Sequence, residues 1–341
     1  MPVTILDIAK ATGKSFSTVS RALSDSGRIS EKTRNMIRET AHGMGYHPSF
    51  VGTALQKGRT GSIAVLLPEI GNPFYAEVMH HLQHYAAQDG LNIIVFDYDY
   101  DTFKERSYLE KMLAGFCDGM IAFLTSFENT SPLISKLWQA HVPLVSIGLP
   151  DSDALPPCYD SVLVNHKEVL RQIFNCIAER GHRHIVKIEE PTTHHFVAVV
   201  KNMLQQVLAD TDLSSRLTLD FHSIPPGSHS PVQDGMEAAK KIFQEHPETD
   251  VMIARDGQQF YGILAALRSI NKRIPEDLLL ITYDNTWITR YAPVPVLGID
   301  QNLEQVVEHA YRMLNDRLFS RQWAPPRCEV VNSQLCNCHN I

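Results

Sequence analysis

The sequence lacks the features of several protein classes. No apolar run reaches the roughly 18 residues that a transmembrane helix needs. The first ten residues, MPVTILDIAK, lack the basic-then-apolar layout of a secretory signal. The 341 residues include only six cysteines, scattered along the chain. We therefore expect a cytoplasmic protein with reduced thiols and no membrane partner.

Motifs of common enzyme classes are missing too. The patterns GxxxxGK[ST], GxGxxG after a strand, GxSxG and HExxH do not occur. The 16 histidines include adjacent pairs, but neighbouring side chains on a helix diverge and make poor chelators. Cys336, Cys338 and His339 have metal-binding side chains without a second cysteine pair. We therefore expect no enzyme activity, no metal site and no cofactor.

Charge is distributed unevenly along the chain. Residues 1–60 hold nine Lys and Arg against four Asp and Glu, a net charge of +5. The remaining residues hold 22 against 34, a net charge of −12. A basic segment joined to an acidic one indicates that the first meets a polyanion, although a solvated basic face gives the same balance.

The N-terminal segment has a three-helix pattern. Thr4 and Asp7 fit a capping box at a helix start, and Gly13 fits a helix end. Ser15 and Ser30 are suited to cap two further helices. Two short helices joined by a glycine turn and followed by a third form a helix-turn-helix, which places the start of its second helix in the major groove of DNA.

The second of these helices carries the side chains expected to read bases. Arg21 can bond guanine O6 and N7, Ser17 can bond several base edges, and Phe16 can touch a thymine methyl. Two alternatives stay open: Arg21 contacts a phosphate, or Phe16 packs at the helix start.

Three motifs occur together in this segment: TVSRAL at 18–23, ISEKTR at 29–34 and GYHPS at 45–49. In this combination they resemble the N-terminal segment of LacI-type (lactose-repressor-like) transcriptional regulators. The resemblance implies a hinge over 47–61 that becomes helical on operator DNA, with Leu55 wedged into the minor groove. A flexible linker with Leu55 as an ordinary packing residue is the alternative. The expected DNA contacts are Thr4, Phe16, Ser17, Thr18, Ser20, Arg21, Arg28 and Leu55.

From residue 62 onward, short apolar runs alternate with segments of helical period. Ser62–Leu67 is typical of a buried strand and Pro73–Gln88 of a helix, and the alternation continues to about residue 282. It predicts an α/β body of two lobes, each a doubly wound parallel sheet. Ligands bind such sheets at the carboxyl ends of the strands, here facing a cleft.

The body resembles the same family at 68–90, 117–123, 180–188 and 274–286. The resemblance implies lobes like those of periplasmic sugar-binding proteins, with three crossings between them near 160, 290 and 322. We therefore expect a helix-turn-helix domain over 1–46, the hinge over 47–61 and an effector-binding and dimerisation domain over 62–341. Lobe one is expected over about 62–160 and 291–321, and lobe two over about 161–290 and 322–341.

The resemblance also implies a pocket for a sugar or a related metabolite. The expected contacts are Asn72, Phe74, Ser126, Asn165, His195, Phe196, Asp256, Asp284 and Gln301. For Asp284 a loop or helix-capping role is the alternative. The pocket departs from the family pattern, because Phe196 replaces a usual arginine and Glu189, Glu190 and Thr282 replace usual glycines.

The sequence therefore predicts a DNA-binding transcriptional regulator, a homodimeric repressor of a near-palindromic operator in the nucleoid. No leucine heptad follows residue 322, which favours a dimer over a tetramer. Two alternatives remain open. One is a global regulator whose body docks a protein partner, and the other is a small-molecule-binding module with a vestigial DNA head.

Overall fold

The structure is a computed structural model that divides into two compact units, Met1–Thr60 and Gly61–Ile341. It describes residues 3–49, 52, 54, 58–124, 127–149, 159–190, 195–225, 230–319 and 323–337. For 127–130, 195 and 337 it describes the backbone alone. None of the described helices combines the length and apolarity needed to cross a bilayer.

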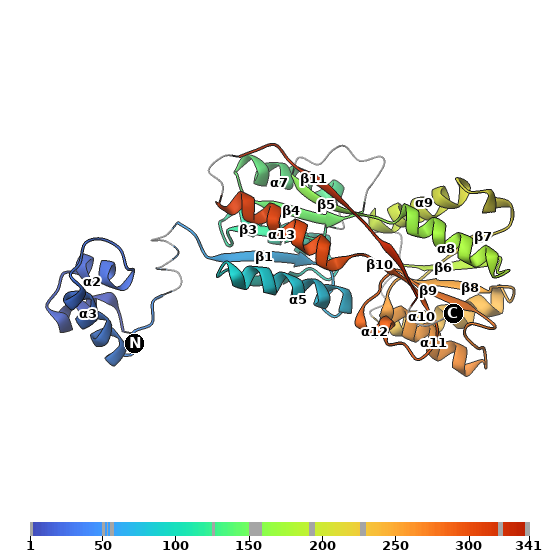
Figure 1. The fold of residues 1–341 in the computed structure, drawn as a ribbon, viewed down its shortest axis with the longest axis horizontal. Coiled ribbons are helices and arrows are strands. Elements are labelled where there is room, and N and C mark those ends of the chain that lie inside the picture. The colour runs from blue at the N-terminus through green and yellow to red at the C-terminus, as the bar shows by residue number, and fades with distance from the viewer. Residues whose placement is uncertain are drawn as a thin grey trace. The chain divides into compact units, whose positions relative to one another are not determined.

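The first unit is a three-helix head made of α1 (Ile5–Thr12), α2 (Phe16–Leu23) and α3 (Glu31–Gly43) (Figure 1). Side chains of Thr4, Ser15 and Ser30 cap the three N-termini, as the sequence predicts. Gly13 ends α1 with a φ of 64°, a left-handed conformation that favours glycine. The buried core of the head consists of Ile8, Val19, Ala22, Ile37 and Ala41.

The second unit contains two six-stranded sheets. The first has the order β11-β5-β4-β3-β1-β2, and its described pairings are all parallel. Its strands are β1 (Ser62–Leu67), β2 (Asn92–Asp97), β3 (Gly119–Ala122), β4 (Leu144–Gly148), β5 (Asp160–Asn165) and β11 (Cys328–Asn332).

The second sheet has the order β12-β10-β9-β8-β6-β7. It is parallel apart from β12, which runs antiparallel to β10. Its strands are β6 (His184–Glu189), β7 (Thr218–Ser223), β8 (Val251–Ala254), β9 (Leu279–Thr282), β10 (Leu297–Asp300) and β12 (Gln334–Asn337). Two parallel-dominated sheets and a helical N-terminal unit confirm the predicted fold class.

Helices cover both faces of each sheet. They are α5 (Pro73–Gln88), α6 (Thr102–Leu113), α7 (Phe127–Gln139), α8 (Lys167–Glu179), α9 (His195–Ala209), the 3₁₀ helix η1 (Asp212–Ser215), α10 (Pro231–Glu245), α11 (Gly257–Ser269), α12 (Trp287–Arg290) and α13 (Leu303–Phe319). Ile63, Val65 and Leu67 of β1 pack with α5 and α13, which share one face of the first sheet (Figure 1). Ala64 and Leu66 point to the opposite face and pack with α6 and α7, because strand side chains alternate.

The second sheet is sandwiched in the same way. Its strands pack with α8 and α9 on one face and with α10 and α11 on the other. The axes of α10 and α11 approach closely at Gly262, where an added Cβ would collide with the carbonyl of Val232.

Three chain segments connect the sheets, and the predicted crossings near 160, 290 and 322 are wrong. The strand β5 pairs with β4, β10 pairs with β9, and β11 pairs with β5, so the crossings follow Asn165, Asp300 and Asn332. An apolar run marks a strand but does not show which sheet it joins, since that depends on distant hydrogen-bond partners. Lobe one is hereafter the first sheet with its helices, and lobe two the second.

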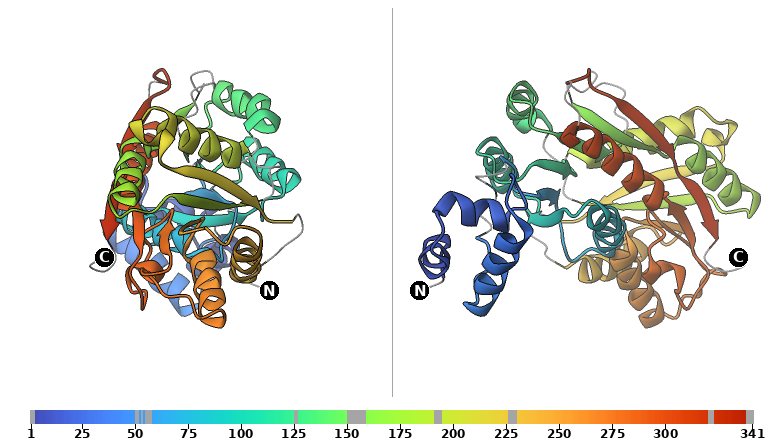
Figure 2. Two further views of the ribbon diagram at one scale, coloured as in Figure 1. Left: turned by 90° about the vertical axis from the view of Figure 1, so that its right-hand side faces the viewer. Right: turned by 60° about the vertical axis from the view of Figure 1, so that its left-hand side comes forward.

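The last crossing is a single residue. Ser333 alone separates β11 in lobe one from β12 in lobe two. Figures 1 and 2 show the red C-terminal strand segment running along both lobes, with β11 beside β5. The two lobes are therefore joined by a nearly continuous extended segment as well as by the crossings after Asn165 and Asp300.

Candidate functional site

The second helix of the head presents one polar face to solvent. Val19 and Ala22 are fully buried, whereas Phe16 is 52% exposed and Ser17 and Arg21 are exposed. Packing in the core therefore does not account for Phe16. The face matches the side chains that the sequence predicts for base contacts.

Local hydrogen bonds shape the start of α2. The hydroxyl of Ser15 accepts from the backbone N–H of Thr18 at 3.2 Å. Its oxygen also lies 3.0 Å from the hydroxyl of Ser17 and 2.8 Å from that of Thr18. These contacts orient the first turn of α2. Thr18, a predicted DNA contact, is half-buried and takes part in the helix cap.

The remaining predicted DNA contacts differ in exposure. Ser20 is half-buried and Arg28 is exposed. The exposed Thr4 donates its hydroxyl to Oδ2 of Asp7 at 2.7 Å, and this hydrogen bond lowers the pKa of Asp7. Thr4 therefore closes the capping box of α1. Leu55 lies outside the described residues.

Two arginines of the head are engaged in internal ion pairs. Arg34 and Arg38 lie 3.3 and 2.5 Å from the same oxygen of Asp25. These pairs join the turn after α2 to α3, so part of the positive charge of the head stabilises its own fold.

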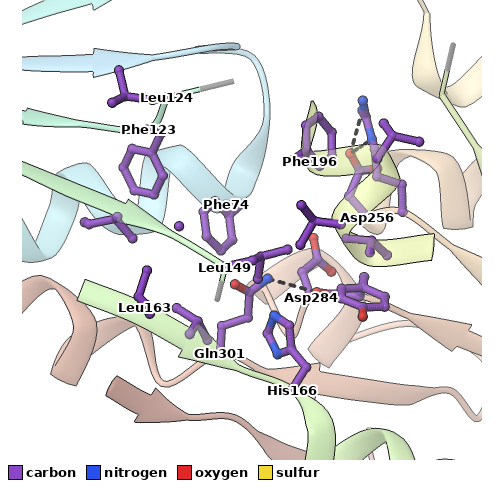
Figure 3. Close-up of a pocket in the computed structure, with 18 of the residues that line it drawn as sticks. Phe74, Phe123, Leu124, Leu149, Leu163, His166, Phe196, Asp256, Asp284 and Gln301 are labelled. Carbon is purple, nitrogen blue, oxygen red and sulfur yellow. Dashed lines mark hydrogen bonds and ion pairs between the residues drawn. The ribbon is translucent and has the colours of Figure 1, made fainter. Parts of the chain in front are cut away.

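The body has a cavity of about 550 Å³ between its two lobes (Figure 3). Many of the residues that line it lie at or after the carboxyl ends of β1, β3, β6, β8, β9 and β10, as expected for parallel sheets, and others lie within β4 and β5. Six predicted contacts line it: Asn72, Phe74, Phe196, Asp256, Asp284 and Gln301. Ser126 and the side chain of His195 lie outside the described residues.

Asn165 is not among the residues that line this cavity, and its predicted ligand contact stays a prediction. Its side chain donates to Oδ1 of Asn332 at 3.0 Å and accepts from the N–H of Lys167 at 3.2 Å. Nearby, Nδ1 of His166 lies 2.8 Å from Oγ of Ser333. Asn165 therefore ties two of the three crossings together, a role that a comparison of single positions with a family pattern does not show.

Asn72 joins the two walls of the cavity. Its Oδ1 accepts from the N–H of Phe74 and caps α5, and its Nδ2 donates to Oδ2 of Asp256 at 3.0 Å. Asp256 in turn caps α11 by accepting from the N–H of Gln259 at 2.9 Å. Both side chains are buried, so the lobes meet here through a hydrogen bond shielded from water.

Asp284 lines the cavity from the same lobe as Asp256 and is equally buried. Its Oδ2 accepts from the N–H of Gly257 at 3.2 Å, whereas no hydrogen bond from the described part of the chain reaches its Oδ1. Burial, reinforced by the charge of Asp256, raises the pKa of Asp284 to about 8. The group is therefore mainly a neutral acid at pH 7.

Arg255 is the main cavity residue that the sequence analysis missed. Its guanidinium lies 2.6 Å from Oδ2 of Asp256 and 3.5 Å from Oε2 of Glu69, and it is paired with Oε1 of Glu190. Burial alone lowers the pKa of Arg255, but Asp256, Tyr100 and Glu69 outweigh it and raise the pKa. Its position directly before Asp256, at the end of an apolar strand, was the available signal.

Three departures from the family pattern have different structural roles. Glu189 and Glu190 line the cavity, whereas Thr282 is fully buried in β9. The hydroxyl of Thr282 donates to the carbonyl of Asp284 at 2.7 Å and so stabilises the following turn.

Aromatic side chains form much of the remaining wall. Phe74 and Tyr75 pack edge-to-face against Phe123 in lobe one. Phe196 from lobe two lies across the cavity from Phe123 (Figure 3). Its ring stacks on Tyr100, with ring centroids 6.5 Å apart. Gln301 is held in place by donating to the carbonyl of Tyr283 at 3.0 Å. The cavity therefore combines apolar surfaces with a polar cluster, as small-molecule sites do.

Metal ligands do not gather in threes anywhere among the described residues. The sequence Cys336-Asn337-Cys338-His339 lies only partly within that range. Cys336 accepts a hydrogen bond from Nδ2 of Asn285 at 3.2 Å.

Comparison with known proteins accounts for both units. The model of bacterial regulatory proteins of the lacI family matches residues 4–49, and the periplasmic binding protein-like domain matches residues 174–337. The chain is 28% identical over 319 residues to the HTH-type transcriptional regulator DegA of Bacillus subtilis, covering 92% of this chain and 90% of that protein. The chain therefore joins a helix-turn-helix domain of the lacI family to a periplasmic binding protein-like domain.

Other LacI-family proteins give the same result. The HTH-type transcriptional repressor PurR of Escherichia coli O139:H28 is 27% identical over 329 residues, covering 96% of this chain and 94% of PurR. The fold also matches the lac repressor dimer bound to operator and the anti-inducer ONPF, with a TM-score of 0.80 at 17% identity and 98% coverage of both chains. With its lacI-family head and these full-length relatives, the protein is accordingly a DNA-binding transcriptional regulator.

Proposed function

We propose that the protein is a homodimeric repressor that binds a near-palindromic operator and changes its DNA affinity when a small metabolite fills the cleft. The exposed face of α2, with Phe16, Ser17 and Arg21 opposite a buried Val19, is the observation that carries this proposal. The lac repressor structure, a dimer bound to operator, provides the precedent for two heads on one duplex. The protein would act in the cytoplasm, where its DNA lies.

Two heads would read half-sites about one helical turn apart. Residues 47–61 would connect each head to its body, with Leu55 inserted into the minor groove. The effector would lie against Asn72, Phe74 and Asp256, between the lobes. An effector shifts DNA affinity only through its different affinities for two lobe arrangements, so it would act by changing the angle between the lobes.

A small effector is favoured over a docked protein as the controlling partner. The cavity of about 550 Å³ has the size of a small-molecule site and buries polar groups from both lobes. A protein partner would use an outer surface and would leave this cavity without a role.

Selection of binding sites from a randomised DNA duplex pool tests the proposal. The purified protein should enrich an inverted repeat with half-site centres roughly 10 base pairs apart, and binding should weaken steeply with salt. Recovery of unrelated sequences at every salt concentration would show that the head does not read DNA.

Arg21→Ala tests base reading at one position. We expect a loss of about 1–3 kcal/mol on the selected operator and relaxed specificity at one base pair, because a bidentate contact to guanine disappears. Titration of the operator and of single-base variants measures both effects.

The matched control is Arg106→Ala, which removes an exposed arginine of α6 that pairs with Glu110. It should leave operator affinity unchanged. Equal losses of Arg21→Ala on operator and random DNA would assign Arg21 to a phosphate contact instead.

A further inference from the structure

The polar end of the cavity has more carboxylates than cations. Glu69, Glu190 and Asp256 surround the single guanidinium of Arg255. The ammonium of Lys187 lines the same cavity, but its Nζ donates to the carbonyl of the neighbouring Ile188 at 2.6 Å. The charge in this part of the cavity is therefore negative.

The guanidinium of Arg255 is already ion-paired with its own carboxylates. Both Nε and Nη2 lie within 2.7 Å of Oδ2 of Asp256, and Nη1 is paired with Glu190. The buried Nη2 still lacks a well-formed hydrogen bond to any of the described residues. A phosphate or carboxylate ligand that approached this nitrogen would come close to Glu69, Glu190 and Asp256, and like charges at close range repel strongly.

Two buried acceptor oxygens of residues that line the cavity receive no hydrogen bond from the described part of the chain. They are Oε2 of Glu189 and Oε2 of Glu190. Lys201 lies 3.6 Å from Oε2 of Glu189, an ion-pair distance without a hydrogen bond. Buried acceptors of this kind need an N–H or O–H donor, which a ligand in the cavity would supply.

Aromatic rings stand beside the same carboxylates. The hydroxyl of Tyr100 donates to Oε2 of Glu69 at 3.5 Å, and the ring of Tyr100 stacks on Phe196. The hydroxyl of Tyr75 lies close enough to Glu69 and Arg255 to interact electrostatically with both. Aromatic faces attract cations through their ring quadrupoles, so rings and carboxylates favour the same sign of ligand charge.

We propose that the cleft selects an organic cation, an amine on an apolar or ring-shaped body, with the ammonium donating to Glu189 and Glu190 and the body against Tyr100 and Phe196. This inference rests on the proposed function and names the chemistry of its effector. A sugar carrying an amino group fits this chemistry, and a sugar phosphate does not.

Four small probes with one shared ring test the proposal: benzylamine, benzyl alcohol, benzoate and phenyl phosphate. Each is added to the full-length protein, and binding is measured by calorimetry and by the shift of the thermal midpoint. We expect benzylamine to bind at least tenfold more tightly than benzyl alcohol, and the two anions to give no shift. Tighter binding of either anion, equal binding of all four probes, or no binding by any of them would overturn the proposal.

Glu190→Gln locates the binding site. It should weaken the binding of benzylamine at least tenfold and leave the binding of benzyl alcohol unchanged, because the variant loses only the charge of the acceptor. Glu189→Gln should also weaken benzylamine binding, and it replaces Glu190→Gln in the test if that variant does not fold. Glu110→Gln, an exposed carboxylate of α6, is the control and should change nothing. Unchanged benzylamine binding in both cavity variants would exclude this site, whereas the operator selection tests the regulatory function separately.

Discussion

Arg255→Met is expected to lower the free energy of unfolding of the body by about 3–5 kcal/mol at pH 7. Only 15% of the Arg255 side chain is exposed, and its removal leaves Glu69, Glu190 and Asp256 without the guanidinium that pairs with all three. Methionine keeps much of the volume, so the loss comes from charge rather than from a cavity. Urea unfolding followed by tryptophan fluorescence measures the change, since all three tryptophans lie in the body.

The pH dependence of this loss identifies its cause. Without the guanidinium, the clustered carboxylates repel one another, so protonation of the folded variant becomes more favourable. The deficit relative to the original protein should therefore shrink as the pH falls from 7 towards 4.

Two companion variants complete the test. Arg255→Lys should lose less, because it keeps the charge while giving up the forked geometry. Arg106→Met removes an exposed arginine paired with Glu110 and should cost less than about 0.5 kcal/mol. A similarly small, pH-independent loss in Arg255→Met would show that the carboxylate cluster does not depend on this cation.

Asp284→Asn should make the body more stable above pH 7, and the gain should disappear in acid. The folded pKa of Asp284 is about 8, against an ordinary value of 3.8, because the buried carboxylate cannot be hydrated. Between these values the unfolded chain releases a proton that the folded chain keeps, so the contribution of Asp284 to stability falls as the pH rises from about 4 to 8. Asparagine does not titrate and still offers an oxygen to the N–H of Gly257.

The expected gain relative to the original protein at pH 8 is at most about 6 kcal/mol, since the pKa shift spans about four units and each unit corresponds to about 1.4 kcal/mol. Urea midpoints from pH 4.5 to 8.5 measure it. Asp277→Asn is a control of opposite sign, because hydrogen bonds from Arg273 lower the pKa of Asp277. It should give no gain at high pH. Parallel curves for Asp284→Asn and the original protein would mean that Asp284 is ionised in the fold.

Local signals predicted the individual elements well. The helix expected over Pro73–Gln88 has those bounds, because Asn72 and Pro73 start it and its apolar period runs to the end. The capping box of Thr4 and Asp7 likewise follows from residues three apart. The division into lobes was placed wrongly, since β5 looks like the first strand of a new block until its pairing with β4 is known.

At the site too, residues recognisable from their local sequence were predicted, whereas a residue defined by distant partners was not. Asp256 and Phe74 were found because each follows a strand in a recognisable segment. Arg255 was missed because the partners that define its role, Glu69 and Glu190, are far from it in the sequence. Motifs identify positions, whereas a charge cluster arises only when separate strands end at the same place.

The direct passage from β11 to β12 has a mechanical consequence. Because only Ser333 separates the two strands, the connection cannot lengthen. A rotation of lobe two must therefore displace β11, the edge strand of lobe one. Such a displacement would move Glu329 of β11, which pairs with Arg312 and His309 on α13. A ligand in the cleft would thus change the position of β11 and its ion pairs to α13, although the residues of these pairs are not among those that line the cavity.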